Sequence, residues 1–202
     1  MLLPVIHKPS DCIILIGIPI HLKDYDRFKD GEFESDFLAR CCTSRTKFFN
    51  EVVQHVQHFL PKIKRYGCNI VQNVTTPDIE RAFMKDVVII FSHWDKQHLE
   101  VNGRLVSDES LCQLIPPDFK GIIDICACQP EDHLVVCIKN RAAAATVKCT
   151  FTKITPAYWI EIIQLTLYLL HKHRLDYMEA SQLVIKQIFK HYYSTKNKTH
   201  AR

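Results

Sequence analysis

Three short, mostly apolar runs constrain the fold of this chain more than any other feature of its sequence. They cover residues 12–18, 86–93 and 121–128, and isoleucine is the residue they use most. Apolar side chains at successive positions are typical of a strand that is covered on both faces. Such strands occur in parallel sheets that carry helices on both sides. The sequence therefore predicts an α/β fold with a mainly parallel sheet.

Helical patterns separate these runs. Apolar residues recur every three or four positions over residues 48–63, which predicts an amphipathic helix that loosens near Pro61 and ends before Gly67. Thr76, Pro77 and Asp78 have the order of a helix start, with a threonine cap, a proline and an acid. Residues 23–44 are polar and irregular, and we expect them to form a long loop.

A hairpin interrupts the alternation of strands and helices. Asn102 and Gly103 lie between alternating residues, which is a strong signal for a tight hairpin turn, and Ser107 follows as the cap of a short helix. Further strands are expected at 69–74 and 145–151, and further helices at 133–144, 156–171 and 177–192. This order predicts a three-layer sandwich, with right-handed crossovers, helices on both faces of the sheet and a small hairpin after the third strand.

The composition fits one domain. The chain has 202 residues, of which 47% are hydrophobic, and this is enough for one packed core. We expect a single domain over residues 1–202, with its core at about 11–192 and a basic tail at 193–202. The net charge of +4 is small and sits partly in that tail, so we do not expect nucleic-acid binding.

The sequence predicts a soluble cytoplasmic protein. No export signal is visible at its start, and the apolar runs 13–20 and 160–170 are shorter than the roughly 20 residues of a membrane-spanning helix. The nine cysteines are an odd number in a chain too large to need disulfides, which suits reduced thiols.

Reactive side chains close two of the predicted strands. His93 ends the run 86–93, and Cys126 and Cys128 end the run 121–128. The carboxyl ends of parallel strands meet at one edge of a sheet, so an imidazole and a thiol would arrive there together. His93 could then take the thiol proton, and the thiolate could attack an acyl carbon. Such a Cys/His dyad needs no metal and no cofactor.

These features resemble the caspase-like fold and, within it, the bacterial CHAT-domain family. The matching features are the strand ending in Ser92-His93, the hairpin at Asn102-Gly103 and the strand ending in Ala127-Cys128-Gln129. The resemblance implies a cysteine endopeptidase that acts on a specific protein partner, such as a defence or cell-death effector. Family members carry glycine after the histidine, whereas this chain has Trp94, and this difference favours the alternative of a catalytically inactive interaction module.

Two cysteines compete for the role of nucleophile. Cys128 matches the Ala-Cys of the family, whereas Asp124-Ile125-Cys126 resembles the Asp-x-Cys of related peptidases. We favour Cys128 and keep Cys126 as the second candidate. Asp124 is a candidate for substrate binding, because period-two alternation puts it on the same face as both cysteines. Trp94 and Arg40 are two further candidates for substrate binding, with packing and an exposed loop as their respective alternatives.

Overall fold

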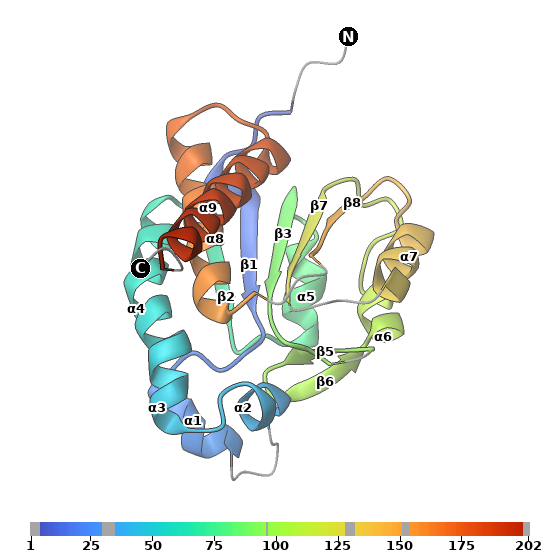
Figure 1. Ribbon diagram of the computed structural model, residues 1–202. Coiled ribbons are helices and arrows are strands. Elements are labelled where there is room, and N and C mark those ends of the chain that lie inside the picture. Colours follow the sequence, from blue (N-terminus) through green and yellow to red (C-terminus); the bar gives the residue numbers. More distant parts are fainter. Residues whose placement is uncertain (1–4, 30–34, 96, 128–131, 151–153, 200–202) are drawn as a thin grey trace.

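The computed structural model describes residues 5–29, 35–95, 97–127, 132–150 and 154–199, with side chains up to residue 190. Its centre is a five-stranded sheet with the order β2-β1-β3-β7-β8 (Figure 1). Every neighbouring pair is parallel, as the sequence predicts. The strands are β1 (Cys12–Ile16), β2 (Asn69–Gln72), β3 (Val87–Phe91), β7 (Ile122–Cys126) and β8 (Thr146–Lys148).

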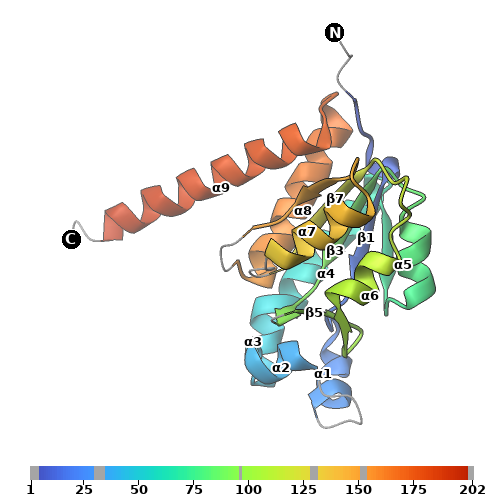
Figure 2. The same ribbon diagram turned by 90° about the vertical axis from the view of Figure 1, so that its right-hand side faces the viewer.

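Helices cover both faces of this sheet, so the predicted three-layer α/β class is confirmed (Figures 1 and 2). One layer contains α4 (Gln54–Arg65), α8 (Pro156–Lys172) and the start of α9 (Tyr177–Thr199), which then projects away from the sheet in Figure 2. The other layer contains α5 (Thr76–Ala82), α6 (Asp108–Gln113) and α7 (Asp132–Arg141).

The apolar runs build two cores, one on each side of the sheet. In β1, Cys12, Ile14 and Ile16 pack into the core under α4 and α8, while Ile13 and Leu15 pack into the core under α5, α6 and α7. All residues of β1, β3 and β7 are buried. Burying each of their large aliphatic side chains contributes roughly 1.5–3 kcal/mol, which explains why apolar residues predominate on both faces of these strands.

A second, antiparallel sheet follows β3 and consists of β4 (Trp94–Asp95), β5 (His98–Val101) and β6 (Arg104–Ser107). Asn102 and Gly103 form its turn with φ angles of 53° and 77°, as the Asn-Gly pair predicts. Ser107 caps α6 by accepting a hydrogen bond from the Ser110 backbone N–H, which confirms its predicted role.

The hairpin lies close against the edge of the main sheet at Gly17, directly after β1. The N–H of Asn102 donates to the carbonyl oxygen of Gly17 at 2.8 Å. A Cβ at Gly17 would collide with the Glu100 carbonyl oxygen and with the Ser92 side chain. Glycine at this position therefore lets the hairpin approach the carboxyl end of the strands.

The prediction of a loop over residues 23–44 is wrong. This region contains α1 (Leu22–Lys29) and α2 (Asp36–Arg40), and α3 (Arg45–Phe48) follows it. Tyr25, Phe28, Phe37 and Leu38 are buried in the core. The helices were missed because they are short and owe their burial to distant parts of the chain, which local periodicity does not report.

Two local details of the helices also differ from the prediction. A π-helical segment, η2 (Phe49–Val53), joins α3 to α4, and α4 continues past Pro61 to Arg65. Helix α5 is capped by Thr75, which forms a capping box with Asp78, so the cap lies one residue before the predicted Thr76. Within the residues that the structure describes, no helix is both long enough and apolar enough to cross a membrane.

Candidate functional site at the carboxyl edge of the sheet

The ends of β3 and β7 lie side by side. The two strands are parallel neighbours with Phe91 opposite Cys126, and the Ser92 N–H donates to the Cys126 carbonyl oxygen at 3.3 Å. His93 follows two residues after Phe91. The chain therefore leaves both strands at the same edge of the sheet, which is the arrangement expected from the sequence.

The imidazole of His93 lies between a carboxylate and a thiol that both come from the α2 region. Its Nε2 is 3.0 Å from Asp36 Oδ2, and its Nδ1 is 4.0 Å from Cys41 Sγ. A carboxylate only accepts hydrogen bonds, so Nε2 carries the proton and the lone pair of Nδ1 faces the thiol. Cys41, His93 and Asp36 thus have the order of a nucleophile, a base and the group that orients the base.

His93 is suited to act as a base. Burial lowers the pKa of its imidazole, and this effect outweighs the hydrogen bond and the charge of Asp36, which act in the opposite direction. Only 11% of the side chain is exposed. The ring is therefore neutral at neutral pH and can accept a proton at Nδ1.

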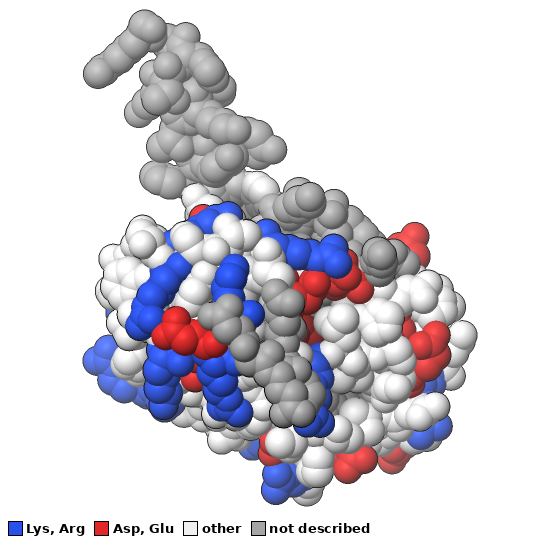
Figure 3. Space-filling model, turned by 90° about the horizontal axis from the view of Figure 1, so that it is seen from below, with Lys and Arg blue, Asp and Glu red and all other residues white. Residues whose placement is uncertain are grey.

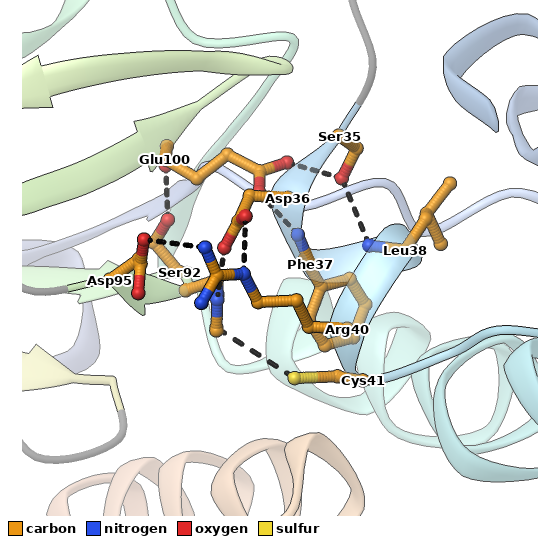
Figure 4. Close-up of polar contacts among 10 residues, drawn as sticks. Ser35, Asp36, Phe37, Leu38, Arg40, Cys41, Ser92, Asp95 and Glu100 are labelled. Atoms are coloured by element: carbon orange, nitrogen blue, oxygen red, sulfur yellow. Dashed lines mark hydrogen bonds and ion pairs between the residues drawn. The ribbon is translucent and has the colours of Figure 1, made fainter. Parts of the chain in front are cut away.

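Buried Glu100 of β5 holds the start of α2 in place (Figure 4). Its carboxylate accepts from the Ser35 hydroxyl at 2.5 Å and from the Phe37 N–H at 2.8 Å, while its own N–H donates to the His93 carbonyl oxygen at 2.8 Å. Burial raises the pKa of Glu100 to about 7, although both hydrogen bonds to its carboxylate oppose this change. Glu100 thereby connects the backbone of the base with the helix that carries Asp36 and precedes Cys41.

Arg40 joins two carboxylates next to His93. Its Nε lies 2.7 Å from Asp36 Oδ1, and its Nη2 lies 3.1 Å from Asp95 Oδ2 (Figure 4). The Arg40 side chain is 55% exposed. Arg40 therefore fixes the orientation of Asp36 and leaves part of its own side chain open to solvent.

The surface at this end of the molecule carries charges of both signs. Seen from below, the end that carries α1–α3 shows Lys and Arg side chains gathered over part of its surface, with acidic side chains among and beside them (Figure 3).

The two predicted site residues on β7, Cys126 and Asp124, are both buried inside the molecule. Cys126 is completely buried, and this burial raises the pKa of its thiol well above the ordinary range. Asp124 is also buried, and its Oδ2 lies 2.6 Å from Lys148 Nζ and 2.7 Å from Tyr177 Oη. A substrate could reach Asp124 only if these contacts broke, so its substrate-binding role stays a prediction.

Two predicted site residues remain, Cys128 and Trp94. Cys128 lies outside the described residues, and its role stays a prediction. Trp94 is 5% exposed and packs in the core under α5, α6 and α7. The placement of Trp94 does not test its predicted role in substrate binding, which stays a prediction.

Sequence reasoning missed Asp36, Cys41 and Glu100. The Ser35-Asp36 pair at the start of α2 is a recognisable capping signal, and it could have identified this helix. No pattern in the sequence brings Cys41 to His93 or Glu100 to the start of α2, because these contacts join residues that are 52 positions (Cys41 to His93) and 65 positions (Ser35 to Glu100) apart.

Two further observations bear on the chemistry of the molecule. Among the residues that the structure describes, no three His, Cys, Asp or Glu side chains come together in a way that could hold a metal ion. No family model matches this sequence, and no curated protein matches it. The functional assignment therefore depends on the geometry and on the resemblance of its motifs.

Proposed function

We propose that this protein is a cysteine endopeptidase of the caspase-like, CHAT type. In the proposed reaction His93 removes the proton of a thiol, and the thiolate attacks the carbonyl carbon of a peptide bond. The C–N bond then breaks, and the protonated His93 returns its proton to the leaving amine. Water, activated by the same imidazole, hydrolyses the resulting thioester and frees the enzyme.

The observation that carries this proposal is the neutral imidazole of His93 at the rim where β3 and β7 end. Its Nε2 is occupied by Asp36 at 3.0 Å, so its Nδ1 is the nitrogen that remains for proton transfer. Orientation by a carboxylate also stabilises the imidazolium that forms in the reaction, as in other nucleophile–base–acid triads. This pair supplies the base that a thiol peptidase needs.

Cys128 is the nucleophile we propose. It stands in the Ala-Cys motif that resembles the family, directly after the strand that neighbours His93. Cys126 is the weaker candidate, because its complete burial disfavours the thiolate and prevents contact with a substrate. The protein substrate, including a role in defence or cell death, follows from the resemblance alone.

A set of peptidyl acyloxymethyl ketones with different P1 residues tests this function. These probes alkylate a catalytic thiol and release a carboxylate, and the labelled residue is found by peptide mass spectrometry. We expect labelling of the intact chain that is lost in Cys128→Ala and in His93→Ala and retained in Cys126→Ala. Circular dichroism of each variant confirms that it is folded.

Two results would count against the proposal. Labelling that maps to another cysteine would overturn the assignment of Cys128. If no probe labels the folded wild-type chain, and a peptide library is not cleaved, the endopeptidase proposal fails and the interaction module becomes the better explanation.

A further inference from the structure

We propose that Cys41 is a second reactive thiol of this site, activated by His93, and that hydrogen peroxide modifies it selectively. The proposal concerns a residue at the end of α2 that the sequence motifs do not involve. It begins from the contact of 4.0 Å between Cys41 Sγ and His93 Nδ1. The reactivity of Cys41 does not depend on the endopeptidase function, whereas its regulatory consequence does.

The proton of Cys41 has a defined acceptor. Asp36 occupies Nε2 of His93, so the unprotonated Nδ1 faces the sulfur. The charges of Asp36, Asp95 and Arg40 act on this imidazole. The two carboxylates stabilise the imidazolium that forms when the proton moves from sulfur to nitrogen, and Arg40 opposes this stabilisation while it also holds both carboxylates in position.

The position of Cys41 makes it accessible to a small oxidant. Its side chain is partly exposed at the end of α2, where its N–H donates to the Phe37 carbonyl oxygen. The neighbouring Cys42 is completely buried, and burial raises the pKa of its thiol to about 12. The two adjacent cysteines therefore differ in their exposure to solvent, and Cys42 serves as a control within the same peptide.

The chemical step requires only the thiol, His93 and peroxide. His93 takes the proton from Cys41, and the thiolate sulfur attacks one oxygen of hydrogen peroxide. The O–O bond breaks, an S–O bond forms, and the departing hydroxide takes the proton back from His93 as water. Cys41 is thereby oxidised to a sulfenic acid by two electrons, and the peroxide is reduced.

Oxidation at this position would affect the base directly. A sulfenic acid on Cys41 adds an oxygen next to His93 Nδ1, the nitrogen that accepts a proton in the proposed peptidase reaction. The site would then be inactive until a thiol reductant restores Cys41. This regulatory step rests on the proposed function.

The test uses the full chain, hydrogen peroxide and dimedone, which traps sulfenic acids. Tandem mass spectrometry distinguishes Cys41 from Cys42 and gives the initial rate at each described cysteine. We expect Cys41 to be trapped at least ten times faster than Cys42. In His93→Gln, the rate at Cys41 should fall at least ten-fold while the rates at the buried cysteines Cys12, Cys42 and Cys68 change less than two-fold.

The matched variant Asp26→Asn separates a specific role of the base from a general change in the surface. It removes an exposed charge on α1 that contacts Arg45 and is not among the charges that act on His93, so the rate at Cys41 should stay within three-fold of the wild type. Trapping of Cys41 at the same rate in the folded wild type and in His93→Gln would overturn the proposal. So would equal trapping of Cys41 and Cys42. Neither result depends on whether the protein cleaves peptides.

Discussion

Asp36 Oδ2 lies 3.0 Å from His93 Nε2, and this contact determines which nitrogen of the imidazole is available as a base. Replacement of Asp36 by asparagine keeps the shape of the side chain but allows the ring to adopt the other tautomer. We expect Asp36→Asn to lower the rate of thiol labelling by the acyloxymethyl ketone probes about 100-fold or more, within the range known for such triads. The rate is measured by intact-protein mass spectrometry.

Asp26→Asn is the control for this prediction, because Asp26 contacts Arg45 and is not among the charges that act on His93. Its labelling rate should stay within a few fold of the wild type. A folded Asp36→Asn variant that reacts at the wild-type rate would show that the carboxylate does not orient the base.

The raised pKa of Glu100, about 7, predicts a pH-dependent stability. Between the ordinary pKa of 4.5 and a value of about 7, the folded protein holds a proton that the unfolded chain has released. The free energy of unfolding therefore falls as pH rises through this window, by at most about 1.4 kcal/mol per pH unit. Glu100→Gln should lose this dependence, because glutamine does not titrate.

Urea unfolding at several pH values between 5 and 8 measures this effect. Relative to the wild type, Glu100→Gln should gain stability as pH rises from 5 to 7, and the difference should level off above about 7. Glu80→Gln, at an exposed position on α5, is the matched control and should track the wild type. Parallel pH curves for the wild type and Glu100→Gln would contradict a shifted pKa.

Asp124, Lys148 and Tyr177 form a buried polar group that connects β7, β8 and α9. The side chains of Lys148 and Asp124 are 10% and 2% exposed, and their charged atoms lie 2.6 Å apart. Lys148→Met leaves a buried carboxylate without its cation, so we expect a loss of about 3–5 kcal/mol in the free energy of unfolding. Tyr177→Phe removes one hydrogen bond and should cost less, about 1–2 kcal/mol.

The double variant Asp124→Leu/Lys148→Met provides the test of this interpretation. Because it removes both charges, it should recover part of the stability that Lys148→Met loses. If the loss in the free energy of unfolding of the double variant equals the sum of the losses of Asp124→Leu and Lys148→Met, the two side chains do not act as a pair.

The parts of the fold that could be predicted are those in which a short stretch of sequence determines the local structure. The apolar run of β3 identified a strand covered on both faces, and the Asn102-Gly103 pair identified the hairpin. The same patterns put His93 at the correct edge of the sheet. Local patterns did not identify α2, because its position depends on Glu100, a charged residue whose burial no local pattern in the sequence reports.

The candidate site was therefore predicted only in part. The position of His93 at the end of a strand can be predicted from the apolar run before it. Asp36 and Cys41, by contrast, reach His93 only through the packing of α2 against the hairpin. The polar contacts of Asp124 inside the molecule were also missed, since alternation shows which face a residue occupies and not which partner it meets. Ion pairs between residues far apart in the chain are therefore the hardest contacts to predict from a single sequence.

Gly17→Ala tests the close packing of the hairpin on the sheet. The added Cβ would collide with the Glu100 carbonyl oxygen and the Ser92 side chain, so we expect a loss of about 1–3 kcal/mol in the free energy of unfolding. The same change should lower the thiol labelling rate, because it displaces the strand that holds α2.

Gly67→Ala is the control for this variant. Gly67 has a φ of +91° and open space around its Cα, so alanine there should cost about 1 kcal/mol through backbone strain and leave labelling unchanged. If Gly17→Ala leaves both stability and labelling at wild-type values, the hairpin does not depend on this contact.

The protonation of His93 tests the central claim most directly, because the account requires a neutral imidazole with its proton on Nε2. Nitrogen-15 NMR across a pH titration reports both the tautomer and the pKa, and His93→Gln identifies the resonance. We predict a proton on Nε2, a pKa below the ordinary 6.5, and a still lower pKa in Asp36→Asn, since Asp36 raises it. A proton on Nδ1, or a pKa that stays the same or rises in Asp36→Asn, would contradict the account.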